Sequence, residues 1–219
     1  MQLLHERKKQ IWDSSKYFLL LFLCWMLVGG TMLLCEQHRS IYVYINKQHT
    51  TIGDAVLPFI SWFGVGWTIT IVLLLLLWMI PKFHTWRYFF AFVFCNIVPF
   101  LLSQLIKNIV DAPRPITYFH NAAWIHKVAE QPINHWLSFP SGHTTGAFAF
   151  FCLLSLLLPK KYAAIGIVFF LLALATGYSR IYLSQHFFAD VYAGSLLGTI
   201  FCLLIFCWIV PNRQLEHSF

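Results

Sequence analysis

The segment Tyr17–Cys35 reads YFLLLFLCWMLVGGTMLLC, and none of its residues carries a charged side chain. A helix of about 20 such apolar residues is long enough to cross the hydrocarbon core of a bilayer. The whole chain of 219 residues is 59% hydrophobic and 11% charged, roughly half the charged fraction of an average soluble domain. We therefore expect one all-α integral membrane domain that covers residues 1–219.

Five more apolar runs follow this segment, so six transmembrane helices are predicted. Their expected bounds are 17–35, 57–80, 88–110, 144–158, 162–180 and 189–210. Three of these runs are followed directly by a proline, as expected where a helix ends; these are Pro81, Pro159 and Pro211. The first run is followed by Glu36 and Gln37 rather than by the small residues of a signal-peptide cleavage site, so this helix is expected to be retained.

The Lys and Arg residues of the loops predict how these helices are oriented. Nine basic residues fall on the side that holds both termini, and six fall on the other side, which also has the two longest loops. Both termini are therefore expected in the cytoplasm of a bacterium, with residues 36–56 and 111–143 at the periplasmic face of the inner membrane. The net charge of +7 does not indicate nucleic acid binding, because the basic residues are scattered between apolar runs.

The outward segment 36–56 allows two interpretations. Ile41, Ile45, His49 and Ile52 recur at helical spacing, which is typical of a short amphipathic helix on the membrane surface. An ordinary loop accounts for the same residues equally well. The six cysteines form no Cys-x-x-Cys pair and lie mostly within apolar runs, so we interpret them as small packing residues. A disulfide is left open only for Cys35, which is expected near a membrane face.

Three polar clusters lie at the outward ends of consecutive predicted helices. They are Lys107 with Arg114-Pro115, then Pro140-Ser141-Gly142-His143, then Ser179-Arg180 with His186 and Asp190. Three cations and only two nearby acids, Asp111 and Asp190, leave positive charge that is costly at a membrane face unless it is paired. A phosphate dianion would balance it, since Arg offers a planar fork to phosphate oxygens and Lys adds a point charge. Asp111, one helical turn from Lys107, either pairs with it or is exposed to solvent.

The second cluster has the features of an anion site at a helix N-terminus. Ser141 is a good N-cap, and the free N–H groups of the first turn attract an anion. Gly142 lets a ligand approach the backbone closely, and His143 can protonate a departing oxygen. In the third cluster, His186 and Asp190 are four residues apart and share one face if they are helical. A carboxylate on one ring nitrogen leaves the other nitrogen free to attack phosphorus.

Together the three clusters resemble the signature blocks of the type 2 phosphatidic acid phosphatase (PAP2) superfamily. Lys107-x6-Arg114-Pro115, Pro140-Ser141-Gly142-His143 and Ser179-Arg180-x5-His186-x3-Asp190 match all eleven signature positions in order. The blocks cover residues 107–190, and the plan of six helices extends the resemblance over nearly the whole chain. A joint match of three blocks is specific, whereas Pro-Ser-Gly-His alone would be weak.

The resemblance implies a role for each residue. His186 would be the nucleophile that forms a phosphohistidine, Asp190 would orient it, and His143 would be the general acid. The phosphate would be held by Lys107, Arg114, Ser141, Gly142 and Arg180. Members of this family need no metal and no other cofactor, and the spacing of His120, His126 and His135 in the outward loop fits no standard zinc pattern.

The expected substrate is a lipid phosphate or diphosphate in the bilayer. The fourth predicted helix is short, which places its phosphate site at or just below the headgroups. Undecaprenyl diphosphate and phosphatidylglycerophosphate are the favoured substrates, and lipid A phosphate is a close alternative. Phosphotransfer to a second lipid would use the same site. A transporter or channel is disfavoured because the charges cluster at one membrane face.

Overall fold

In the computed structural model, residues 2–35 and 38–210 are described, and every regular element in these ranges is a helix. The α-helices are α1 Gln2–Cys35, α2 His38–Lys47, α3 Thr51–Ser61, α4 Gly66–Met79, α5 Trp86–Val110, α6 Pro115–Tyr118, α7 Gly142–Leu157, α8 Ile165–Tyr182 and α9 Phe188–Ile209. Three short 3-10 turns, η1 Trp62–Gly64, η2 Pro81–Phe83 and η3 Lys160–Tyr162, connect some of them. The all-α prediction is confirmed, whereas Glu36, Gln37 and Pro211 lie outside the described residues.

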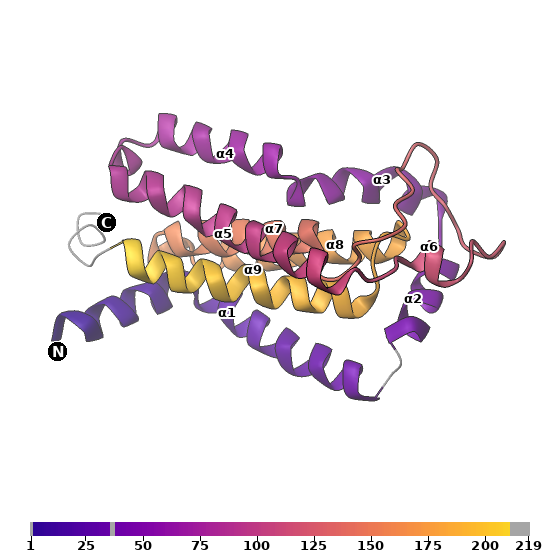
Figure 1. Cartoon of the computed structure of the whole chain (residues 1–219). Helices are drawn as coiled ribbons and strands as arrows, with labels where there is room; N and C mark the ends of the chain where they lie inside the picture. Colours follow the sequence, from indigo (N-terminus) through magenta and orange to yellow (C-terminus); the bar gives the residue numbers. More distant parts are fainter. Residues whose placement is uncertain (1, 36–37, 211–219) are drawn as a thin grey trace.

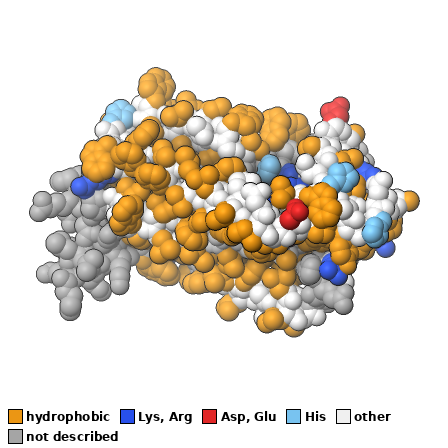
Figure 2. Space-filling model, in the orientation of Figure 1, with side chains coloured by type: hydrophobic (Ala, Val, Ile, Leu, Met, Phe, Trp, Pro, Cys, Tyr) orange, Lys and Arg blue, Asp and Glu red, His pale blue; other side chains and the backbone are white. Residues whose placement is uncertain are grey.

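Four helical stretches are long and apolar enough to cross a membrane, and they identify a multi-pass membrane protein. They are Lys9–Cys35, Trp86–Tyr118, Ile165–Tyr182 and Phe188–Ile209. A fifth span is possible if the bent pair Thr51–Gly64 and Gly66–Met79 counts as one, and α7, at 16 residues, is shorter than these spans. Hydrophobic side chains cover the flank of the bundle in Figure 2, whereas charged and histidine side chains gather near its two ends. Six complete spans remain a prediction.

The bundle is arranged around α7. Eleven of its sixteen residues are buried, and it packs among α5, α8 and α9 (Figure 1). Helices α7 and α9 approach each other so closely that a Cβ on Gly198 would lie 2.3 Å from the carbonyl oxygen of Thr145. Small residues permit this kind of contact between helices that share a membrane. The start of α1 and the end of α9 lie at one end of the bundle, and α2 and α6 lie at the other.

The predicted helix 57–80 is wrong as a continuous element. It divides into α3 and α4, which are inclined at 61° to each other, with η1 and the extended residue Val65 between them. Close packing explains the break, since a Cβ on Gly64 would lie 2.2 Å from the carbonyl oxygen of His143 at the start of α7. The backbone of η1 therefore rests directly on α7. The sequence Gly64-Val65-Gly66 was the only local signal for this break.

The described part of the segment 36–56, residues 38–56, contains helices rather than an ordinary loop. Helix α2 includes Ile41 and Ile45, and α3 begins just before Ile52. Tyr42 of α2 is fully buried and packs against Phe119 and Phe187 at ring-centroid distances of 5.7 and 5.5 Å. All six cysteines are free, including exposed Cys35, and Cys95, Cys152 and Cys202 are buried in the core as small packing residues.

Candidate active site

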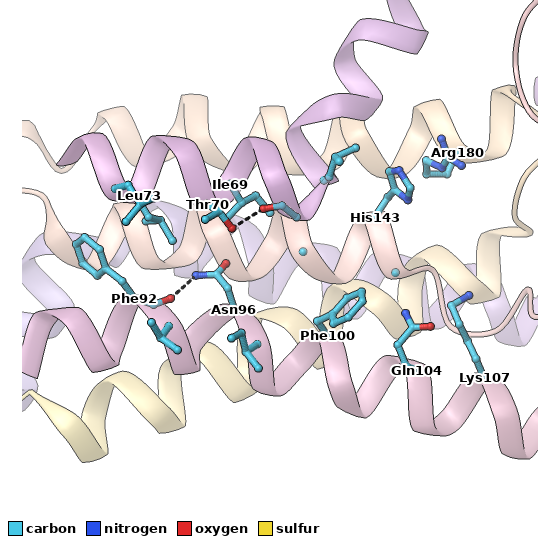
Figure 3. A pocket seen from close by; sticks show the side chains of 18 of the residues that line it. Ile69, Thr70, Leu73, Phe92, Asn96, Phe100, Gln104, Lys107, His143 and Arg180 are labelled. Atoms are coloured by element: carbon cyan, nitrogen blue, oxygen red, sulfur yellow. Dashed lines mark hydrogen bonds between the residues drawn. The ribbon is translucent and has the colours of Figure 1, made fainter. Parts of the chain in front are cut away.

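A cavity of about 560 Å³ extends between α4, α5 and α7. Its polar end contains most of the residues that the sequence singled out: Lys107, Arg114, Gly142, His143, Arg180 and His186. Away from these residues it becomes a largely apolar groove between α4 and α5. Figure 3 shows Lys107 of α5 facing His143 and Arg180 across the polar end, with Ile69, Leu73, Phe92 and Phe100 further along the groove.

Ser141 and Asp190 do not line the cavity but contact the residues that form its polar end. Ser141 is fully buried, and its Oγ accepts a hydrogen bond from the Thr144 N–H at 3.4 Å, as expected for the N-cap of α7. The Ser141 N–H donates to the carbonyl oxygen of Asp190 at 2.9 Å. This bond ties the start of α7 to the start of α9. A direct contact between Ser141 and phosphate remains a prediction.

His186 and Asp190 form a buried pair, but not on the face of one helix. His186 precedes α9, and its Nδ1 lies 3.4 Å from Oδ2 of Asp190. The same carboxylate oxygen accepts hydrogen bonds from Ser138 Oγ at 2.5 Å and from the Phe187 N–H at 2.9 Å. Asp190 thus caps the first turn of α9 while it holds the imidazole. Because Nδ1 is directed to Asp190, Nε2 is the ring nitrogen that remains for the cavity.

The surroundings of His186 keep its ring neutral. Burial lowers the pKa of His186 well below its usual value, and the nearby charges of Arg114, Lys107 and Arg180 lower it further. Both effects disfavour the imidazolium, since a cation loses solvation in a buried site and is repelled by other cations. A neutral imidazole has the lone pair that a nucleophile requires.

The three cations are fixed by contacts that leave part of each group directed at the cavity. Lys107 Nζ donates to the carbonyl oxygen of Leu137 at 2.5 Å, while Asp111 is exposed, so the predicted alternative of a Lys107–Asp111 pair is wrong. Arg114 Nη1 donates to Oε1 of Gln185 at 2.8 Å. These contacts place positive charge on the walls of the cavity without neutralising it, as an anion site requires.

Arg180 is a buried cation of the site whose hydrogen bonding is incomplete. Its side chain is 6% exposed, and Nη1 donates to Ser61 Oγ of α3 at 2.6 Å. Its Nε is buried and has no hydrogen-bond partner within residues 2–35 and 38–210. A buried donor without a partner is unfavourable unless something else satisfies it. A phosphate oxygen in the polar end of the cavity would do so.

The residues at the polar end of the cavity lie in a part of the chain that is similar to a known protein family. The sequence profile of the PAP2 superfamily matches residues 84–214, a range that contains all three predicted blocks. The chain belongs to the PAP2 superfamily. The predicted resemblance and the expectation of a PAP2-type phosphatase are thereby confirmed at the level of the family.

Named relatives of this PAP2 protein act on several lipids. A lipid A 1-phosphatase of Rhizobium johnstonii is 34% identical over 116 residues, which cover 53% of this chain and 44% of that protein. An undecaprenyl-diphosphatase of Sulfolobus acidocaldarius is 28% identical over 202 residues, which cover 88% of each chain. The chain thus spans about half the length of some curated relatives and most of the length of others.

A solved structure has the same fold as this PAP2 protein. The crystal structure of a transmembrane phosphatidylglycerolphosphate phosphatase from Bacillus subtilis superposes with a TM-score of 0.64 at 20% identity. The superposition covers 87% of this chain and 94% of the other. The common fold therefore extends beyond the three blocks to nearly all of the helices.

Sequence reasoning missed several residues that shape the PAP2 site. Ser61 holds Arg180, Ser138 holds Asp190, and Gln185 holds Arg114. Ser61 and Ser138 lie outside the signature blocks, and Gln185, next to His186, had no pattern of its own that linked it to Arg114. The loop between α6 and α7 also contributes through its backbone, because the carbonyl oxygens of Trp136 and Leu137 accept hydrogen bonds from Arg114 and Lys107.

Two of the three histidines in the loop between α6 and α7, His126 and His135, have separate partners. His126 Nε2 bonds to Oδ1 of Asp54 at 2.8 Å, and its ring stacks on His49 at 3.9 Å. His135 Nδ1 bonds to Thr117 Oγ1 at 3.0 Å. Within the part of the chain that the structure describes, no three His, Cys, Asp or Glu side chains are grouped as a metal site. These histidines connect loop and helices in the observed fold.

The contact between η1 and α7 gives a first prediction. In Gly64→Ala, the new methyl group would meet the carbonyl oxygen of His143 at 2.2 Å, so the start of α7 must move. We expect kcat/KM to fall about 100-fold, because a displacement of about 1 Å at a reacting group costs this much. Gly66→Ala is the matched control, since a Cβ there meets nothing within 4 Å. Equal phosphatase activity of the two purified variants would contradict the proposed contact.

Proposed function

We propose that this chain is a metal-independent lipid phosphatase that acts through a phosphohistidine at His186. The observation that carries the proposal is the buried, unpartnered Nε of Arg180 beside His186, at the polar end of an otherwise apolar groove. The polar end fits a phosphate group, and the apolar groove fits a hydrocarbon chain. Phosphoryl transfer depends mainly on positioning and charge neutralisation, and the three cations supply both.

The proposed reaction has two displacements at phosphorus. In the first, the Nε2 lone pair of His186 forms the P–N bond as the bond from phosphorus to the lipid oxygen breaks. His143 gives its proton to that oxygen, and the dephosphorylated lipid leaves. In the second, His143 takes a proton from water as the water oxygen attacks phosphorus. The P–N bond breaks, inorganic phosphate is released, and both histidines return to their starting states.

Asp190, Lys107, Arg114 and Arg180 act on charge in this scheme. The carboxylate of Asp190 stabilises the His186 ring as it gains positive charge on phosphorylation. Donors from the three cations, together with the N–H groups at the start of α7, hold the phosphoryl oxygens. The negative phosphate also favours the protonated form of His143, which the first displacement requires.

The proposed substrates follow from the groove and from the relatives. Undecaprenyl diphosphate and phosphatidylglycerophosphate are favoured, and lipid A phosphate is the alternative. The first and the third are substrates of relatives of this chain, and the second is the substrate of the Bacillus subtilis protein that has the same fold. We propose that six helices cross a bacterial inner membrane with the site at the periplasmic face. The depth of α7 supports this, since a short helix in the centre of the bundle places its N-terminus near the headgroups.

A panel of purified substrates tests this function. We expect the purified chain in detergent, with EDTA present, to release inorganic phosphate from at least one of undecaprenyl diphosphate, phosphatidylglycerophosphate, phosphatidate and lipid A. No phosphate from any of them would exclude the function, and activity that depends on added metal would exclude the mechanism. Label that appears on a second lipid instead of in free phosphate would identify a phosphotransferase at the same site.

A further inference from the structure

The cavity changes character at Gln104, between the polar end and the apolar groove. Gln104 precedes Lys107 by three residues on α5, so the two side chains leave the helix on the same face about 4.5 Å apart along its axis. Figure 3 shows Gln104 between Phe100 and Lys107, across the cavity from His143. A Cβ on Gly142 would lie 3.6 Å from Gln104 Nε2, which places the amide against the start of α7.

The amide of Gln104 is available to a ligand. Its side chain lines the cavity and makes no hydrogen bond within the described residues. The other polar side chains of the groove differ in this respect. Asn96 Nδ2 donates to the carbonyl oxygen of Phe92, and Thr70 Oγ1 donates to that of Gly66 (Figure 3). Gln104 therefore has a pair of N–H donors directed into the cavity with no internal use.

The position of Gln104 corresponds to the part of the substrate just beyond the scissile bond. The leaving oxygen must lie near His143, and the rest of the lipid continues toward the groove. In a diphosphate, the next group is a second phosphate, one bridging oxygen away. In a monophosphate ester, the next group is a carbon without hydrogen-bonding capacity. The free amide of Gln104 can donate a hydrogen bond to the second phosphate of a diphosphate, whereas it has no partner in the carbon of a monophosphate ester.

The charges of the site lead to the same assignment. Lys107, Arg114 and Arg180 give three positive charges, and Asp190 removes one of them, which suits the dianion of a terminal phosphate. The inner phosphate of a diphosphate adds one more negative charge beside Gln104, between the terminal phosphate and the apolar groove. A neutral donor there stabilises the added charge, whereas a carboxylate would repel it.

Below Gln104 the groove has the shape for one hydrocarbon chain. It runs between two helices, with Phe100, Ile97 and Phe89 on the α5 side and Leu73 and Leu77 on the α4 side. From Gln104 to Phe89 the helix rises about 22 Å, which is most of the thickness of a bilayer core. A single extended chain fits a groove of this form.

We propose that Gln104 binds the inner phosphate of a diphosphate attached to a single long hydrocarbon chain, and so determines specificity for diphosphates over monophosphates. This inference rests on the proposed function and goes further by naming the substrate class and the residue that selects it. No bond is made or broken at Gln104, whose role is to bind substrate.

Farnesyl diphosphate and farnesyl monophosphate provide the test, because they share a hydrocarbon chain and differ by one phosphate. For Gln104→Glu, which keeps the side-chain shape and adds a negative charge, we expect kcat/KM to fall on the diphosphate about tenfold more than on the monophosphate. Gln104→Ala should raise KM for the diphosphate several-fold with little change for the monophosphate. The Gln104→Ala variant also tests the inference if Gln104→Glu does not fold.

Gln48→Glu is the matched control. It makes the identical substitution at an exposed residue that directly follows α2 and does not line the cavity. We expect both substrates to keep their wild-type rates in this variant. Equal losses on the two substrates in the Gln104 variants, or a larger loss on the monophosphate, would overturn the assignment. A wild-type chain that hydrolyses neither substrate nor any other lipid phosphate would instead overturn the proposed function itself.

Discussion

His186→Ala is expected to lower kcat for lipid phosphate hydrolysis by about 10⁴-fold or more. Loss of a nucleophile in a hydrolase with a covalent intermediate has effects of this size or larger. No neighbouring group is placed to replace it, because His143 lies at the N-terminus of α7 and, among the residues that the structure describes, has no carboxylate partner placed as Asp190 is for His186. The residual rate should reflect only the cations around the phosphate.

The measurement is rapid-quench labelling with a substrate that carries radioactive terminal phosphate. Wild-type protein should retain acid-labile, base-stable label on the chain, as a phosphohistidine does, and His186→Ala should retain none. His84→Ala is the control, since His84 is exposed and lies just before α5, at the opposite end of that helix from Lys107. Label on the His186→Ala protein would show that a different residue is the nucleophile, whatever the steady-state rate.

Arg180→Lys is expected to reduce kcat/KM by about 100- to 1,000-fold although it keeps the positive charge. Lysine has neither the planar fork nor the Nε donor, and it cannot both bond to Ser61 and reach the phosphate. Removal of one preorganised donor to a developing oxyanion costs about this much. The unpartnered Nε indicates that this donor is reserved for substrate.

Arg39→Lys is the matched control for this substitution. Arg39 is exposed and stacks on Tyr118 at 4.1 Å, outside the cavity that holds His186. Steady-state kinetics in the same detergent should show wild-type behaviour for Arg39→Lys. If Arg180→Lys stayed within about threefold of wild type, positive charge alone would be sufficient. Melting temperatures of both variants separate a change in the site from a loss of folding.

The sequence predicted which residues come together because topology restricts where they can lie. Lys107, His143 and Arg180 occupy ends of successive apolar runs that alternate in direction, so a membrane protein must bring them to one face. The cavity confirms that these three residues converge. The N-cap role of Ser141 was predictable for a local reason, since Ser directly before a helical run is a common cap.

Other features of the site depend on contacts between distant segments, and no local pattern encodes them. Hydropathy does not distinguish a straight helix from one that bends at Val65, because both are apolar throughout. Ser61, the last residue of α3 before that bend, accepts the hydrogen bond of Arg180. The pairing of His186 with Asp190 was predicted correctly, but through helical spacing; the structure instead makes Asp190 a cap for Phe187. A spacing of four residues fits both arrangements.

The hydrogen bond from Ser141 to the carbonyl oxygen of Asp190 also concerns the order of biosynthesis. The start of α7 leaves the ribosome well before α9, yet its backbone is bonded to α9, the last helix that the structure describes. Lys107 and His143 are therefore synthesised before His186 and Asp190. If His186 is the nucleophile, as we propose, a nascent chain has no phosphatase activity until α9 has been made, so the host lipids are not exposed to an incomplete enzyme.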